Sequence, residues 1–217
     1  MAPALQKDQK LIDAAKDFAN VPWCENYERM LSGMLYECMD PMLVAARHRA
    51  RILQQKYNNF PLEGTTPAVQ EERNKILKEL LGKLGNDGYT ENLQVDYGCN
   101  ISIGERFYAN YNCVILDCSS VTIGDRVMLG PGVSIFTATH ETSIESRRAN
   151  IEYAAPVVIG NDCWIGGNST ILPGVTIGDG CTIGAGSVVT KSIPPYSVAV
   201  GTPARVIKQV DRPSSDA

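Results

Sequence analysis

Histidine, basic charge and long apolar runs are all scarce in this chain. Its 217 residues include two histidines, and 20 Lys plus Arg stand against 24 Asp plus Glu, for a formal net charge of −4. General nucleic-acid binders need a basic face that displaces counterions, so this balance disfavours a nucleic-acid partner. No apolar run approaches the roughly 18 residues of a membrane span, and the first residues lack the apolar stretch of a secretion signal. We therefore expect a cytoplasmic protein with no membrane partner.

Disulfide spacing is also missing. The seven cysteines are odd in number and include no CxxC pair. Without a secretion signal, this pattern predicts reduced thiols rather than a disulfide framework. The length allows one domain, or one domain with an appendage.

Helix signals are confined to residues 1–89. Asp40-Pro41 sets an N-cap residue before a proline at the first helical position, and the apolar pattern that follows predicts a helix ending near residue 58. Thr66-Pro67 repeats this start, and Gly85 can close the second helix. Residues 1–20 carry few such signals, and we expect them to be weakly ordered.

After residue 90 an aliphatic residue recurs at every sixth position, with one slip and one gap. A period of six fits neither an amphipathic helix nor a lone alternating strand. It fits a solenoid with three flat faces, in which each face uses one hexapeptide and one coil takes about 18 residues. The series consists of Ile103, Ala109 and Ile115; Ile123, Leu129 and Ile135; and Ile159, Ile165, Ile171, Ile177, Ile183 and Val189.

Small residues also recur at the 18-residue spacing of one coil. Cys163 precedes Cys181 by 18 residues, as Ser169 precedes Ser187, so each pair would stack in one inward column. A thiol in such a position acts as a compact apolar filler. We therefore expect Cys163 and Cys181, together with Cys113, to serve structure rather than chemistry.

The repeat stops after residue 136 and resumes at residue 157. The residues between are polar and charged, and His140 stands near their start. Sites are commonly built on loops that a rigid scaffold positions. The predicted organisation is a helical segment at 1–89, a hexapeptide solenoid at 90–210 with an excursion loop at 137–156, and a disordered tail at 211–217.

Specific stretches resemble the maltose/galactoside O-acetyltransferase family, which includes the Nod-factor acetyltransferases. The resemblance runs from about residue 24 to 209. It implies a mainly β fold, a left-handed parallel β-helix of hexapeptide repeats with an N-terminal α-helical cap. It also implies acetyl-CoA as co-substrate, a sugar or glycoside acceptor, no metal, and a homotrimer. The matching stretches are residues 30–36, Asp40-Pro41 with Arg47, 107–112, Thr139-His140, 164–167, 184–191 and 201–205.

His140 is the candidate catalyst. A sugar hydroxyl is a poor nucleophile until its proton is removed as it attacks the thioester. Histidine titrates near neutrality, so it can take that proton and pass it to the leaving thiolate. The resemblance implies direct transfer in a ternary complex, with His140 as general base.

The resemblance also assigns the binding residues. Glu152 could orient His140 or hold acceptor hydroxyls. Galactoside-type enzymes carry a second Asp directly after Asp117, whereas this chain has Cys118 there, so the acceptor stays open. The expected acceptor-side residues are Arg47, Asp96, Tyr108, Asn110, Asp117 and Glu152. The expected coenzyme A residues are Trp164, Gly167, Ala185, Thr190, Lys191, Arg205 and Lys208, which supply small side chains for a narrow groove and cations for phosphates.

Other classes share the hexapeptide coil. A zinc lyase of the γ-carbonic anhydrase type needs three histidines on its metal, and this chain has only His48 and His140. A non-catalytic hexapeptide assembly protein and a serine or xenobiotic acetyltransferase are further alternatives. The segment from residue 30 to 57 favours the sugar-acetylating group.

Overall fold

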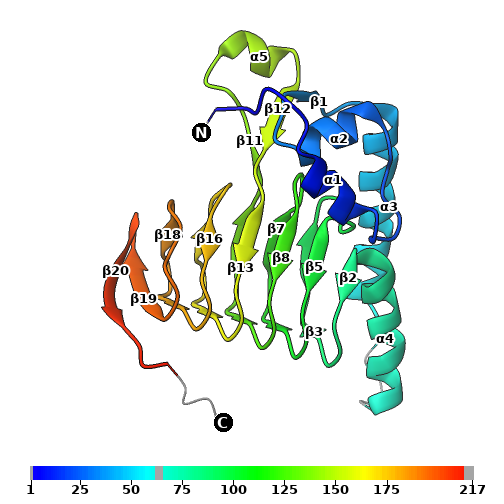
Figure 1. Cartoon of the computed structure of the whole chain (residues 1–217). Coiled ribbons are helices and arrows are strands. Elements are labelled where there is room, and N and C mark those ends of the chain that lie inside the picture. Colours follow the sequence, from blue (N-terminus) through cyan, green and yellow to red (C-terminus); the bar gives the residue numbers. More distant parts are fainter. Residues whose placement is uncertain (1, 62–65, 213–217) are drawn as a thin grey trace.

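The computed structural model describes residues 2–61 and 66–212, and Figure 1 shows a β-solenoid with helices over its N-terminal end. The predicted mainly β fold, a parallel β-helix with an N-terminal helical segment, is confirmed. Most of the tail predicted at 211–217 lies outside the described residues. The helices are α1 (Gln9–Ala15), α2 (Glu25–Leu31), α3 (Pro41–Asn58), α4 (Pro67–Leu80) and α5 (Ile144–Arg148).

Three sheets form the sides of the solenoid, and the chain visits them in a fixed order. Face 1 contains β2 (Lys83–Leu84), β5 (Ile101–Ile103), β8 (Val121–Ile123), β13 (Val157–Ile159) and β16 (Thr176–Ile177). Face 2 contains β3 (Tyr89–Thr90), β6 (Tyr108–Ala109), β9 (Met128–Leu129), β14 (Trp164–Ile165), β17 (Thr182–Ile183), β19 (Ser197–Gly201) and β20 (Ala204–Gln209). Face 3 contains β4 (Leu93–Val95), β7 (Cys113–Leu116), β10 (Ser134–Phe136), β15 (Thr170–Ile171) and β18 (Val188–Val189).

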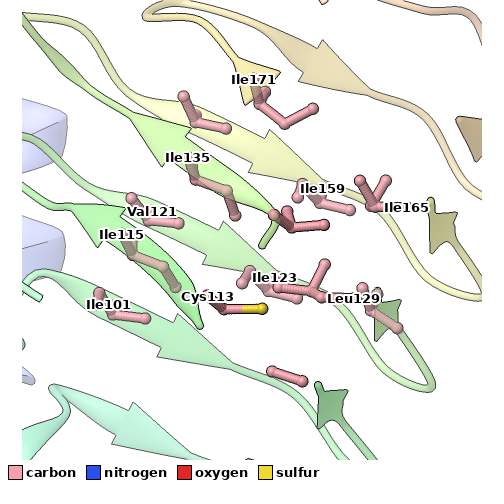
Figure 2. Packing of buried hydrophobic residues seen from close by; sticks show 14 of the residues in the cluster. Ile101, Cys113, Ile115, Val121, Ile123, Leu129, Ile135, Ile159, Ile165 and Ile171 are labelled. Carbon is pink, nitrogen blue, oxygen red and sulfur yellow. The ribbon is translucent and has the colours of Figure 1, made fainter. Parts of the chain in front are cut away.

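The six-residue repeat becomes the core of the solenoid. Ile115, Ile135 and Ile171 pair in register on adjacent strands of Face 3, and all three are fully buried. Figure 2 shows them stacked with the aliphatic residues of the other faces. Cys113, Cys163 and Cys181 are also buried, and burial raises the pKa of the Cys113 thiol to about 11. These thiols therefore lie in the interior, as expected.

A glycine followed by Asp or Asn comes directly after β8, β13 and β16 on Face 1, and the same corner geometry explains each pair. The side chain of Asp179 accepts a hydrogen bond from the amide of Asn161 (2.7 Å), and Asn161 in turn accepts one from the amide of Asp125 (2.8 Å). A Cβ on Gly160 would lie 2.7 Å from the Asp179 amide nitrogen. The coils can therefore approach at this corner only because glycine precedes each acceptor.

Two local expectations were wrong. Residues 1–20 contain α1, which Asp8 caps and whose Ile12 is buried under the cap. Helix α4 begins after its N-cap Thr66 as predicted, but it ends at Leu80 rather than at Gly85. Gly85 follows β2 at a solenoid corner, where a Cβ would lie 2.5 Å from the Gly104 carbonyl oxygen. The parallel strand pairing of the solenoid thus begins at β2, before residue 90.

Candidate active site

The excursion loop is anchored by a small antiparallel sheet of β1 (Tyr36–Glu37), β12 (Ile151–Ala154) and β11 (Ala138–Thr139). In Figure 1 the loop, with α5 at its tip, projects from the solenoid beside the helical cap. The register pairs Thr139 with Tyr153 and Tyr36 with Glu152. His140, directly after β11, therefore lies opposite Glu152.

His140 and Glu152 form a pair at this edge of the solenoid. Nε2 of His140 lies 3.7 Å from Oε1 of Glu152, and the side chains are 49% and 21% exposed. The other carboxylate oxygen, Oε2, accepts a hydrogen bond from the Tyr36 hydroxyl at 2.8 Å. An accessible imidazole beside a carboxylate held on its other side is a competent arrangement for proton transfer.

A cavity of about 190 Å³ shares the Glu152 side chain with this pair. It brings together Arg47, Asp96 and Glu152, three of the expected acceptor-side residues. The Arg47 guanidinium donates to the Tyr97 hydroxyl and, at 2.7 Å, to the Cys38 carbonyl oxygen. The full lining consists of Cys38, Arg47, Arg51, Asp96, Tyr97, Cys118 and Glu152.

Asp117, another of the expected acceptor-side residues, is not among the residues that line this cavity. It is fully buried, and its Oδ1 accepts hydrogen bonds from the amides of Asp96 (3.1 Å) and Tyr97 (2.9 Å). Its Oδ2 accepts a third from the Asn100 amide (3.3 Å), and burial raises the pKa of this carboxyl to about 7. Asp117 therefore holds the turn that carries Asp96, and its carboxyl is buried away from solvent.

Cys118 makes a contact that its position in the sequence did not reveal. Its Sγ donates to Oδ2 of Asp96 at 3.5 Å, and burial raises the pKa of both side chains. A protonated thiol thus faces the Asp96 carboxyl inside the cavity.

Sequence reasoning also missed Tyr36, Cys38, Arg51 and Tyr97 as members of the site. Arg51 carried a usable signal, because it follows Arg47 by four residues and so lies on the same side of a helix. Tyr97 adjoins Asp96 in the sequence. Tyr36 and Cys38 offered no local signal, because they meet the loop only through the pairing of β1 with β12.

Tyr108 and Asn110 lie at a different edge of the solenoid. Tyr108 begins β6 on Face 2, and Asn110 follows this strand and precedes β7 on Face 3, whereas His140 lies between Face 3 and Face 1. Tyr108 stacks on Tyr89 with ring centroids 6.0 Å apart, and Oδ1 of Asn110 accepts from the amide of Tyr111. A single chain therefore separates these two residues from His140 by the width of Face 3.

The expected coenzyme A residues occupy the later coils. Trp164 is 51% exposed on Face 2. Gly167 and Ala185 follow Face 2 strands, and a Cβ on Gly167 would lie 3.0 Å from the Pro131 carbonyl oxygen, so the surface there is tight. Arg205 and Lys208 are exposed on β20, opposite Val200 and Val198. Thr190 and Lys191 are exposed directly after β18, at the same edge of the solenoid as His140.

The described part of the chain lacks both a cluster of metal ligands and a membrane-spanning helix. Within residues 2–61 and 66–212, no three His, Cys, Asp or Glu side chains gather as potential metal ligands. Over the same residues, no helix combines the length and apolar character needed to cross a bilayer.

Known proteins share both parts of this architecture. The maltose acetyltransferase hexapeptide capping motif matches residues 29–85, and the bacterial transferase hexapeptide model, of six repeats, matches residues 156–191. The galactoside O-acetyltransferase of Escherichia coli (strain K12) is 40% identical over 185 residues, which are 85% of this chain and 89% of that protein. The chain belongs to the maltose and galactoside O-acetyltransferase family. It is an acyltransferase, as its sequence predicted.

Solved structures support the same assignment. A maltose O-acetyltransferase from Clostridium difficile 630 superimposes with a TM-score of 0.81 at 46% identity, covering 87% of this chain and 99% of that one. A galactoside acetyltransferase in complex with coenzyme A gives a TM-score of 0.79 at 39% identity, covering 87% of this chain and 92% of that one. The family's helical cap corresponds to the segment from α2 to β2 that carries Tyr36 and Arg47.

Proposed function

We propose that this acyltransferase moves an acetyl group from acetyl-CoA to a hydroxyl of a sugar or glycoside, with His140 as general base. The observation that carries the proposal is the His140–Glu152 pair beside the cavity that contains Arg47 and Asp96. The relatives named for maltose and galactoside O-acetylation support the acceptor class.

The chemistry is a direct transfer. The acceptor hydroxyl oxygen attacks the thioester carbonyl carbon while the imidazole of His140 removes the hydroxyl proton. A carbon–oxygen bond forms, the carbon–sulfur bond breaks, and the proton passes from the imidazolium to the coenzyme A thiolate. The carboxylate of Glu152, 3.7 Å from Nε2, stabilises the imidazolium while it exists.

The acceptor cavity suits a neutral polyhydroxylated ring. Arg47 and Arg51 supply donors, and Asp96 and Glu152 supply acceptors, so the four charges balance. A lining with both donors and acceptors matches vicinal hydroxyls, each of which both donates and accepts. The cavity is small, which favours one ring with the remainder of the acceptor outside it.

We also propose that the enzyme works as a homotrimer. Face 1 presents mainly polar outward side chains, among them Lys83, Thr122 and Thr176. Face 2 presents an outward column of Tyr89, Tyr108, Met128 and Trp164, and Face 3 presents Val114, Leu116 and Phe136. Outward apolar columns of this kind, with Met128 and Trp164 exposed and the others half-buried, are typical of surfaces that a second chain covers.

The trimer would also complete the site. If the edge between Face 2 and Face 3 of one chain meets the edge between Face 3 and Face 1 of the next, Tyr108, Asn110 and Trp164 approach the neighbour's His140. Coenzyme A would then lie along this junction. Its phosphates would contact Lys191, Arg205 and Lys208, and its pantetheine would pass Gly167, Ala185 and Thr190. All seven cysteines are free thiols, which fits the cytoplasmic location proposed for the enzyme.

The test uses purified protein, acetyl-CoA and a thiol reporter with a panel of sugars, glycosides, serine and xenobiotic alcohols. His140→Ala is compared with His48→Ala, which removes the exposed histidine of α3. We expect His140→Ala to lower kcat by about 10²–10⁴ while folding and acetyl-CoA binding persist, and His48→Ala to resemble wild type. A folded His140→Ala enzyme with near-normal kcat would refute the base. Transfer to serine or xenobiotics alone would refute the acceptor class.

A further inference from the structure

Tyr36 is a buried phenol from the helical cap whose hydroxyl reaches the catalytic loop. It is 2% exposed, and its hydroxyl donates to Oε2 of Glu152 at 2.8 Å. The two residues are 116 positions apart in the sequence. No step of the proposed transfer uses Tyr36.

The contact is fixed from both sides. The backbones of Tyr36 and Glu152 are partners in the antiparallel pairing of β1 with β12. The Tyr36 ring packs in the apolar cluster that contains Met30, Leu43 and Cys118. Burial holds the pKa of the Tyr36 hydroxyl well above its usual range, so this group stays a neutral donor. A rigid donor on a rigid strand therefore meets one carboxylate oxygen.

The consequence falls on the other oxygen. Glu152 has a flexible side chain, and a free carboxylate on a partly exposed loop strand samples several rotamers. With Oε2 held by Tyr36, Oε1 is left 3.7 Å from Nε2 of His140. The geometry of the pair thus depends on a hydroxyl that does not touch His140.

We propose that Tyr36 is a positioning residue, whose hydroxyl fixes the Glu152 carboxylate so that Oε1 faces His140. Tyr36 thereby couples the helical cap to the chemistry of the excursion loop. The inference rests on the proposed function, because it takes His140 as the general base. Small displacements of a catalytic group lower the rate strongly, whereas binding of coenzyme A on distant coils is unaffected.

The test is Tyr36→Phe, which keeps the ring and removes only the hydroxyl. Tyr57→Phe is the matched control, because Tyr57 is also fully buried in the cap and its hydroxyl bonds to the Thr90 carbonyl oxygen, away from the loop. We expect kcat of Tyr36→Phe to fall about 10-fold while KM for acetyl-CoA stays within about 2-fold of wild type. Tyr57→Phe should lower Tm by a similar amount and leave kcat unchanged.

A double-mutant cycle with Glu152→Ala identifies the route of the effect. If Tyr36 acts through Glu152, the double variant has the same kcat as Glu152→Ala alone. Multiplicative losses would overturn the proposal, as would equal kcat values for Tyr36→Phe and Tyr57→Phe. Failure of the base itself is distinguishable, because in that case His140→Ala retains activity. If His140→Ala is inactive and Tyr36→Phe is normal, only the positioning role is refuted.

Discussion

Replacing Gly160 with alanine should separate two coils at the corner between Face 1 and Face 2. The new Cβ would lie 2.7 Å from the Asp179 amide nitrogen and 2.9 Å from the Gly178 carbonyl carbon. Both are backbone atoms, so no side-chain rotation relieves the contact. The coils must move apart, which also stretches the 2.7 Å hydrogen bond from the Asn161 amide to Asp179.

The magnitude follows from these two losses. Overpacking against backbone typically costs about 1–3 kcal/mol, and loss of one hydrogen bond costs roughly 1 kcal/mol. Gly160→Ala should therefore lower the free energy of unfolding by about 2–4 kcal/mol. For a chain of this size that corresponds to a fall in Tm of roughly 5–15 °C.

Gly186→Ala is the control that separates contact from backbone conformation. Gly186 has φ +70°, which disfavours alanine, but no described atom lies within 4 Å of its would-be Cβ. Left-handed φ costs alanine about 1–2 kcal/mol, so Gly186→Ala should be the milder change. Thermal and denaturant unfolding of both variants measure which of the two substitutions lowers stability more. A Gly186→Ala protein less stable than Gly160→Ala would refute the contact argument.

Three further changes test individual assignments. Asp117→Asn should cost about 1–3 kcal/mol, because its NH₂ would face the Asn100 N–H. Since burial raises the pKa of Asp117 from 3.8 to about 7, folding favours the protonated carboxyl, and wild type should lose stability as the pH rises from about 4 to about 7. The Tm gap between wild type and variant should narrow over this range; a constant gap would contradict this. Arg205→Ala should raise KM for acetyl-CoA about 5- to 10-fold, a modest loss because solvent screens an exposed contact to phosphate. Equal affinities of variant and wild type for acetyl-CoA by calorimetry would remove Arg205 from the site. Cys163→Ser should cost about 1–2 kcal/mol and leave kcat unchanged, since its Sγ is buried and donates to the Gly178 carbonyl oxygen inside the solenoid; loss of kcat in the folded variant would contradict the structural role.

Features set by local chemistry could be read from the sequence. The starts of α3 and α4 were predictable because an N-cap side chain and a following proline act within a few residues. The solenoid was predictable because every coil packs against its neighbours in the same way, so inward aliphatic residues recur at a fixed period in the sequence. Gly85 was assigned to a helix end because glycine serves both helix ends and tight corners, and only the pairing of β2 with β5 decides between them.

The site was only partly predictable because its geometry depends on pairing between distant segments. His140 could be singled out by its place where the repeat stops, and Glu152 by its place on the returning strand. Nothing near Asp117 in the sequence reveals that three amides of the 96–100 turn occupy its oxygens. Tyr36 was missed for the same reason, because its partner lies 116 residues away.

The helical cap contributes directly to the structure of the excursion loop. A solenoid corner alone would leave residues 137–156 with one short strand pair, β11 with β12. Pairing of β12 with β1 adds a third strand from the cap, and this addition sets the register that places Tyr36 beside Glu152. The cap also supplies Arg47 to the cavity from α3. The hexapeptide repeat therefore provides the rigid edge from which the loop projects. The cap adds the strand and the side chains that surround His140 and Glu152 there.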